Sequence, residues 1–454
     1  MIFGFPLPGP ASSVPSRRRR ARPGVLATWA VLTALAIPAA AQTAAPAPAA
    51  AASVPAAAAS APGATPPPPF TLADLVRMTR DGSALLAAER ARINAAESAV
   101  VSARALPNPE VEVLMGRLGA RQPGVNTGSA GTVSVTQPIE LPGLRRARRE
   151  EATASLDGTR SAVGAATLDV LAEVKLRYYQ VLRRDAEWRA AQEDLTLAND
   201  IRERVRARVE AGEAPRFELI RADTERLNAL RLVQTAQLRI EQSRAELRRL
   251  VGPLLPETFT VDGSLQDPLP PQAAAERARE DLLASHPQLV AARAEVRAAE
   301  ARIELERNRR LPSVAVRGTH DREPDSRITR AGVVMTLPLF DRRAGPIGEA
   351  EAAAMRARAA LADRELQLTQ SLSVALQQYE ISTAQVSAFE TGIVREAENA
   401  LRVAQAAYRF GERGILDYLD AQRSLRQARN ELNAARYDRW AALVELERLR
   451  AVQP

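Results

Sequence analysis

Two turn motifs that lie half a chain apart constrain the fold more than any other feature. Residues 408–421 read Tyr-Arg-Phe-Gly-Glu-Arg-Gly-Ile-Leu-Asp-Tyr-Leu-Asp-Ala, and residues 211–222 read Ala-Gly-Glu-Ala-Pro-Arg-Phe-Glu-Leu-Ile-Arg-Ala. Gly212 corresponds to Gly411, and Ala222 to Ala421, at the same offset of 199 residues. Glycine adopts the left-handed conformation that reverses a chain between antiparallel helices. The sequence therefore predicts an internal duplication with two equivalent helical hairpin tips.

Long helices dominate the pattern around these turns. No proline interrupts residues 144–210, where apolar residues recur mostly every three, four or seven positions. Such a helix would be about 100 Å long, far more than a globular domain needs. Further helices are expected at 217–250, 343–410 and 415–450. Another begins at Thr71, a predicted N-cap, and ends near Arg104 before two prolines.

Four short segments have the period of β-strands. They are centred on Val111–Met115, Val133–Ile139, Val314–Val316 and Val333–Leu339, and a charged loop is expected at 320–330. Each segment has about the length of a tilted transmembrane strand, with polar residues on its second face. Four strands cannot close a barrel, and open edges are not stable in lipid. Two or three copies of the chain would therefore have to pool their strands.

The domain organisation follows from composition and from the repeat. A basic run at Arg17–Arg22 and an apolar stretch precede Ala39–Ala41, which indicates a signal peptide over 1–41. Residues 42–70 are rich in Ala and Pro and are predicted to be a linker. The first repeat is expected at 71–251, a connection at 252–271, and the second repeat at 272–454.

Composition excludes several classes of function. The net charge of +8 lies partly in the leader arginines, and no compact basic patch with interleaved aromatics favours nucleic acid. The sequence lacks a nucleophile–base arrangement, a phosphate loop and a cofactor motif, so we expect neither an enzyme nor a cofactor. His320 with Asp321, Glu323 and Asp325 is interpreted as a solvated loop rather than a metal site.

From Thr71 to Arg450 the chain resembles the TolC-type outer-membrane efflux proteins. Two motifs, Gln-Pro-Ile-Glu-Leu-Pro-Gly-Leu-Arg at 137–145 and Pro-Leu-Phe-Asp-Arg-Arg-Ala-Gly at 338–345, are most similar to the heavy-metal, CzcC- and CusC-like branch. The resemblance implies a mainly α-helical chain with a membrane β portion, built from a duplicated helix, β-hairpin, long helix and helix. It further implies a homotrimer with a twelve-stranded barrel in the outer membrane and a long helical tunnel in the periplasm.

The resemblance also assigns roles to residues at the tips. Asp417 and Asp420 are three residues apart and share one helical face, so three copies would form two rings of carboxylates that favour cations. These residues match the channel constriction of the family. Tyr408, Arg413 and Glu218 match its gate latch, although Phe217 replaces a hydroxyl residue there. The tip residues expected to contact a periplasmic adaptor are Gly212, Glu213, Gly411 and Gly414.

The expected function is that of a passive exit duct. It would join a periplasmic adaptor to an inner-membrane pump of the resistance-nodulation-division type and release heavy-metal cations through the outer membrane. One alternative is a duct for drugs, other organic compounds or type I secretion. Another is a periplasmic coiled-coil scaffold without a pore, which predicts no lipid-facing strands.

Overall fold

The computed structural model describes residues 69–119, 127–267 and 275–451, which lie in one compact unit, Thr65–Pro454. The predicted signal peptide and linker residues 42–68 fall outside these ranges. Phe70 is the first residue with a described contact, because it forms a parallel bridge with Val261. Phe70 lies one residue before Thr71, the predicted start of the first repeat.

Helices make up most of the described chain. Thr71 caps the first helix as predicted, since its hydroxyl oxygen accepts a hydrogen bond from the backbone N–H of Asp74 at 3.2 Å. The helix predicted over 144–210 is α3, which has 69 residues. The helices are α1 (Leu72–Gly82), α2 (Ala84–Arg104), α3 (Pro142–Glu210), α4 (Arg216–Val251), α5 (Ala275–Ser285), α6 (Pro287–Asn308), α7 (Ala344–Ala388), α8 (Val394–Arg409) and α9 (Ile415–Leu449).

One predicted helix is interrupted. The pattern over 343–410 predicts a continuous helix, but a π-helical turn, η1 (Phe389–Ile393), separates α7 from α8. In this turn the backbone N–H of Val394 donates to the carbonyl of Phe389, five residues earlier. A π-turn shifts the side-chain register without ending the helix, so apolar spacing alone did not reveal it.

All four predicted strands form one antiparallel sheet in the order β1 (Glu110–Leu118), β2 (Gly128–Ile139), β3 (Ser313–Arg322) and β4 (Arg327–Thr336). The central pairing of β2 with β3 joins the two halves of the chain. The loop predicted over 320–330 was too long, because His320 and Asp321 lie within β3 and residues 323–326 form the turn.

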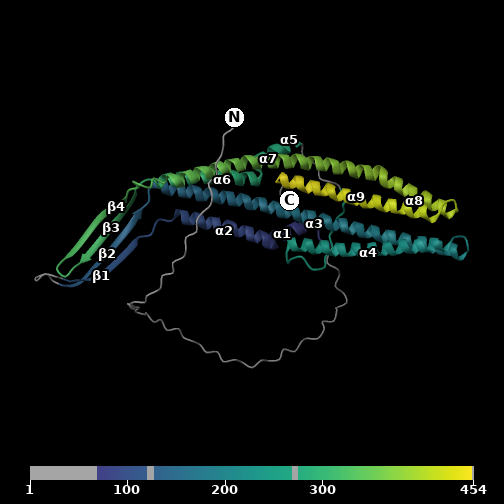
Figure 1. The fold of residues 1–454 in the computed structure, drawn as a ribbon, viewed down its shortest axis with the longest axis horizontal. Coiled ribbons are helices and arrows are strands. Elements are labelled where there is room, and N and C mark those ends of the chain that lie inside the picture. The colour runs from purple at the N-terminus through teal and green to yellow at the C-terminus, as the bar shows by residue number, and fades with distance from the viewer. Residues whose placement is uncertain (1–68, 120–126, 268–274, 452–454) are drawn as a thin grey trace, which may run out of the picture. The chain divides into compact units, whose positions relative to one another are not determined.

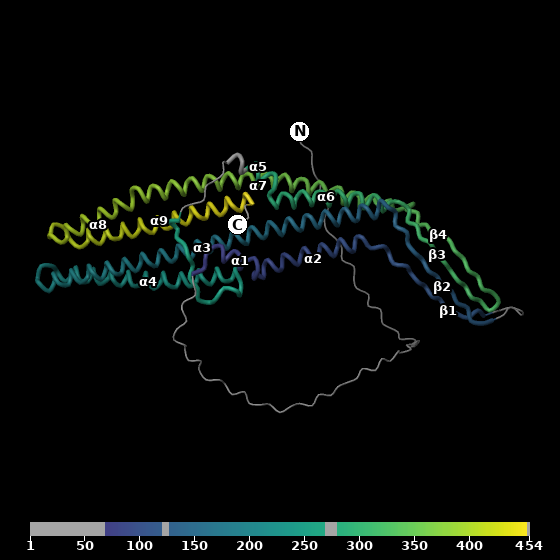
Figure 2. The backbone as a smooth tube through the Cα atoms, turned by 180° about the vertical axis from the view of Figure 1, so that it is seen from behind, coloured from purple at the N-terminus to yellow at the C-terminus, as the bar shows by residue number. Residues whose placement is uncertain are grey.

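The sheet and the helical hairpin tips lie at opposite ends of the helices (Figures 1 and 2). Because α3 runs from the end of β2 to the first tip, its length of about 100 Å sets this separation. The main core lies between these ends, where the rings of Tyr179 and Trp440 stack with centroids 4.5 Å apart. Leu255, Phe259 and Leu265 of the inter-repeat connection are buried in the same core. The connection is therefore part of the packed structure.

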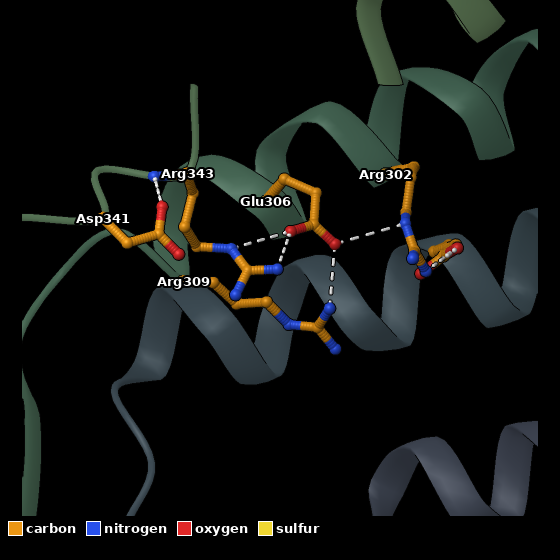
Figure 3. A network of polar contacts seen from close by, with 6 residues as sticks. Arg302, Glu306, Arg309, Asp341 and Arg343 are labelled. Carbon is orange, nitrogen blue, oxygen red and sulfur yellow. Dashed lines mark hydrogen bonds and ion pairs between the residues drawn. The ribbon is translucent and has the colours of Figure 1, made fainter. Parts of the chain in front are cut away.

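A buried carboxylate fastens the sheet to the helices. Glu306 at the end of α6 is surrounded by three guanidinium groups, as Figure 3 shows. Its carboxylate oxygens lie 2.6 Å from Arg343, 2.8 Å from Arg309 and 3.4 Å from Arg302. Arg343 has a left-handed backbone (φ 55°) at the start of α7, and its backbone N–H donates to Asp341 at 2.8 Å. The network thus links the segment that leaves β4 to the helix that enters β3.

Candidate functional site

The two hairpin tips have the same backbone geometry. Gly212 (φ 77°) donates its N–H to the carbonyl of Val209, and Gly411 (φ 75°) donates to Tyr408 in the same way. The following residue, Glu213 or Glu412, donates to a carbonyl five residues earlier in each tip. This pair of bonds is the Schellman arrangement that ends helices at a left-handed glycine. The predicted equivalence of the tips is confirmed at the level of single hydrogen bonds.

Gly414, the second glycine of the 408–421 tip, differs from Gly411 in its backbone conformation. Its φ of −79° and ψ of 167° are extended, and it stands at the N-cap of α9. Gly411 is therefore the left-handed glycine of this tip, and Gly414 is not. A single left-handed residue is sufficient here, because the chain enters α9 through an extended one.

An apolar cluster holds the two hairpins together just behind the tips. Tyr408 of α8 and Tyr418 of α9 lie in it with ring centroids 6.0 Å apart. The buried members come from all four helices and are Ile201, Val205, Ala222, Tyr408, Ile415, Tyr418 and Leu419. Because this cluster is intramolecular, the relative position of the two tips is fixed within each chain.

Tyr408 also makes the polar contacts between the two hairpins. Its hydroxyl donates to a carboxylate oxygen of Glu218 on α4 at 3.0 Å. The guanidinium of Arg208 on α3 lies 4.8 Å from the centre of the Tyr408 ring and donates to the Tyr408 carbonyl at 3.2 Å. Sequence reasoning identified Tyr408 and Glu218 but missed Arg208, whose only signal was its position four residues before Gly212.

The environment of Tyr408 keeps its hydroxyl protonated. Burial raises the pKa of Tyr408 to about 12, and the hydrogen bond to the Glu218 carboxylate acts in the same direction. The nearby Arg208 cation opposes this shift. A neutral phenol is the only form that can donate to Glu218, so this contact persists throughout the physiological pH range.

Arg413 is placed differently from the predicted latch. Within the described chain it forms an ion pair with Asp417 at 3.6 Å, one turn away on the same side of the tip, and not with Glu218. Both side chains are exposed. Within one chain, the expected contact of the Tyr408 hydroxyl with Glu218 is therefore present, and the expected contact of Arg413 with Glu218 is not. A contact of Arg413 with Glu218 of another copy stays a prediction.

The two candidate constriction residues lie on the first turns of α9. Asp417 and Asp420 are both exposed, as a ring facing a tunnel would require. Asp417 has the Arg413 cation beside it, whereas Asp420 forms no ion pair with the described residues. The carboxylate charge at Asp420 is thus the less compensated of the two.

A buried acid, Glu225, lies farther from the tip than Asp420 does. Glu225 on α4 accepts hydrogen bonds from Arg423 at 2.9 Å and Arg426 at 3.1 Å, both on α9. Burial alone would raise the pKa of Glu225, but the two arginines outweigh it, so its pKa is lowered. The ionised pair network therefore adds to the apolar cluster in joining the hairpins.

No resident metal site is found in the described part of the chain. There, no group of three or more His, Cys, Asp or Glu side chains is arranged to hold a metal ion. His320, which raised this question, lies on β3 with its ring nitrogen Nδ1 2.9 Å from the Thr329 hydroxyl. None of the helices among the described residues is both long and apolar enough to cross a membrane.

Comparison with known families decides the class of protein. The pattern of the family described as "Outer membrane efflux protein" matches residues 75–253 and 278–451, one segment in each half of the chain. The chain belongs to the outer membrane efflux protein family. This efflux protein is accordingly placed in the outer membrane, and its family and fold are those of channel proteins rather than of enzymes.

Two curated relatives come from metal-resistant systems. The cobalt-zinc-cadmium resistance protein CzcC of Cupriavidus metallidurans is 29 % identical over 80 % of this chain and 85 % of its own length. The nickel-cobalt-cadmium resistance protein NccC of Alcaligenes xylosoxydans xylosoxydans is 27 % identical over 65 % of this chain and 66 % of its own. The resemblance of this efflux protein to the heavy-metal branch is confirmed at this modest identity.

Solved structures confirm the fold. The outer-membrane channel OprN superposes with a TM-score of 0.73 over 84 % of this chain and 90 % of its own, at 19 % identity. CusC superposes with a TM-score of 0.72 over 84 % of this chain and 91 % of its own, at 17 % identity. The mainly helical chain with a small sheet predicted for this efflux protein is therefore correct.

Proposed function

We propose that three copies of this chain form the outer-membrane exit duct of a tripartite efflux system that exports heavy-metal cations. The strands would close a twelve-stranded barrel, and the helices would continue it as a periplasmic tunnel ending at the hairpin tips. A periplasmic adaptor would contact those tips at Gly212, Glu213, Gly411 and Gly414. An inner-membrane resistance-nodulation-division pump would supply the energy.

The carrying observation is the four-stranded sheet with two different faces and two open edges. One side, here called the apolar face, is dominated by Val111, Val113, Val133, Val135, Val314, Val316, Val333 and Met335, which the register places in adjacent rows. Val333 and Val111 are 67 % and 65 % exposed, and Met115, which lies on the same face, is 87 % exposed. A contiguous apolar surface of this kind needs a nonaqueous neighbour.

The opposite face, here called the polar face, is cross-linked by hydrogen bonds. Thr132 donates to Asp321 at 2.7 Å, and Ser134 donates to Glu112 at 3.2 Å. Arg317 donates to the hydroxyl of Thr136 at 2.9 Å. Lipid outside and water inside is the environment that such alternation fits. Ten residues of tilted strand cover about 25 Å, the height of a membrane apolar band.

The open edges support assembly from several copies. Within the described chain, β1 and β4 each pair on one side only, and every residue of both strands is exposed. Unpaired backbone groups cost several kcal/mol each in hydrocarbon, so the edges must pair with each other. Pairing of β1 with β4 of the next copy closes the sheet, and three copies supply twelve strands.

The cargo is proposed from the metal-resistance relatives and from the tips. In a trimer, Asp417 and Asp420 would form two rings of three carboxylates about one helical turn apart, which bind cations and exclude anions. Because Arg413 lies beside Asp417, we assign most of the selectivity to Asp420.

Conductance of the purified protein in planar bilayers tests this proposal. Asp420→Asn should reduce cation selectivity more than Asp417→Asn, and the double variant should reduce it most. Glu241→Gln is the matched control, because Glu241 is an exposed acid on α4 far from the tip. Absence of any conductance would contradict the duct, whereas conductance with equal effects of all variants would contradict the carboxylate rings. Transport of organic compounds but not of divalent metals would instead favour the drug-exporting alternative.

A further inference from the structure

Three arginines lie together at the outer end of the apolar face of the sheet. Arg117 follows Met115 on this face of β1, and Arg322 of β3 is the register partner of both Gly131 and Arg327. All three arginines are exposed. They occupy the end of the strands that is remote from the helices (Figure 1). On β1 and β2 the patch borders Val113 and Val133 directly, whereas on β3 and β4 His320 and Thr329 occupy the next row.

Two of these arginines face each other at close range. The turn residues Glu323 and Ser326 exchange backbone hydrogen bonds at 2.9 and 3.4 Å, which makes Arg322 and Arg327 the adjacent, non-hydrogen-bonded pair. Side chains approach most closely at such pairs, and like charges there are destabilising. Among the described residues, no carboxylate lies within ion-pair distance of the three arginines. A bound anion would relieve this repulsion.

The arginines of the polar face differ from this patch. Arg330 forms an ion pair with Asp321 at 2.9 Å, and Arg317 donates to a threonine hydroxyl. Each arginine on the polar face therefore has a partner within the sheet. Among the described residues the three arginines of the apolar face have no such carboxylate partner, which leaves their guanidinium groups available to an external anion.

The strands also lack the usual interfacial anchors. Membrane barrels carry girdles of aromatic residues at both interfaces. None of the four described strands contains Phe, Tyr or Trp. Arginine with its apolar stem on the sheet and its head at the interface is an alternative anchor when the headgroups are anionic.

We propose that Arg117, Arg322 and Arg327 form a binding site for the phosphate of a lipid headgroup at the outer end of the barrel. The guanidinium groups hold the phosphate, and the acyl chains lie along the neighbouring valines of β1 and β2. Guanidinium binds phosphate oxygens in a bidentate manner, which suits two arginines on adjacent strands. This inference rests on the proposed function, because it requires the apolar face to meet lipid.

Binding of lipid A, a bis-phosphorylated glucosamine lipid, to the purified detergent-solubilised protein tests the site. The variant Arg322→Gln/Arg327→Gln removes the facing pair, and Arg317→Gln/Arg330→Gln removes two arginines from the polar face of the same two strands. At about fivefold per arginine, the first variant should lose about 25-fold in affinity. The control should bind like the wild type. Dephosphorylated lipid A should bind all forms equally weakly.

Three results would overturn the site. These are equal losses in both variants, equal binding of dephosphorylated lipid, and displacement of lipid A by inorganic phosphate at the same concentration. Bilayer conductance separates this inference from the proposed function, because Arg322→Gln/Arg327→Gln changes only the lipid-facing side of the sheet and should conduct normally. A conducting variant with unchanged lipid binding would refute the lipid site alone, whereas a wild type that never inserts would refute the duct.

Discussion

Replacing Glu306 tests how the sheet is fastened to the helices. Its side chain is 3 % exposed, while those of Arg302, Arg309 and Arg343 are 48, 38 and 32 % exposed. Removing one partner of a fully buried ion pair costs about 3–5 kcal/mol, and an exposed pair contributes about 0.2–1 kcal/mol. Because the three cations keep part of their hydration, we expect Glu306→Ala to lower the free energy of unfolding by about 2–3 kcal/mol.

The pH dependence distinguishes electrostatics from packing. Burial alone would raise the pKa of Glu306, but the hydrogen bond from Arg343 and the three nearby cations lower it below its ordinary value. A lowered pKa stabilises the folded state above the ordinary value of 4.5, and this contribution is lost as the pH falls through the folded-state pKa. The difference in the free energy of unfolding between wild type and Glu306→Gln should therefore be full at pH 7 and shrink as the pH falls below 4.5.

The assay is guanidinium-induced loss of the helical circular-dichroism signal of the purified protein at several pH values. Glu304→Gln is the matched control, since Glu304 lies on the same helix but is 56 % exposed and pairs with Arg307 alone among the described residues. Its free energy of unfolding should change by less than about 0.5 kcal/mol. An effect of Glu306→Gln that is equally small, or that does not shrink as the pH is lowered from 7 to below 4.5, would refute the reasoning.

Two further predictions concern the tips. Tyr408→Phe removes the donor to Glu218 and should weaken the contact between hairpins by about 1–2 kcal/mol, raising the open probability in bilayers about tenfold. A Tyr408→Phe variant that opens as often as the wild type would contradict this prediction. In the wild type the contact should be independent of pH below 10 and be lost toward pH 12, since the pKa of Tyr408 is raised to about 12. Gly411→Ala should cost about 1 kcal/mol because its φ is 75°, whereas Gly414→Ala should change stability by less than about 0.5 kcal/mol. Hydrogen exchange at the Glu412 amide measures both glycine effects, and equal effects would exclude backbone strain as the cause.

Features with a local physical cause could be predicted from the sequence. The uninterrupted apolar spacing over 144–210 predicted α3 to within two residues at its start, because proline and glycine mark both ends. The 199-residue offset of Gly212 and Gly411 predicted two equivalent turns, since both positions need a positive φ. The period of two predicted the four strands, although β4 ends at Thr336 and leaves out Leu337 and Leu339 of the predicted fourth segment.

Features that depend on distant contacts could not be predicted in the same way. Arg208 is one of many arginines in the sequence, and only folding places it over the Tyr408 ring. Glu306 is likewise one acid among many until β4 returns Arg343 to it. Arg413 was paired with Glu218 by resemblance, but Asp417 lies one helical turn away and competes locally for the same cation.

Cross-linking of the sheet edges tests the central claim most directly. The sequence contains no cysteine, so single cysteines at Val113 on β1 and Val333 on β4 of one chain provide the only thiols. Neighbouring register positions on the two edges supply further pairs. Oxidation of these cysteines in isolated outer membranes should give, for at least one pair, disulfide-linked species of two and three chains and none larger. Monomers for every pair, or a ladder that ends at any other number of chains, would contradict closure of one barrel by three copies.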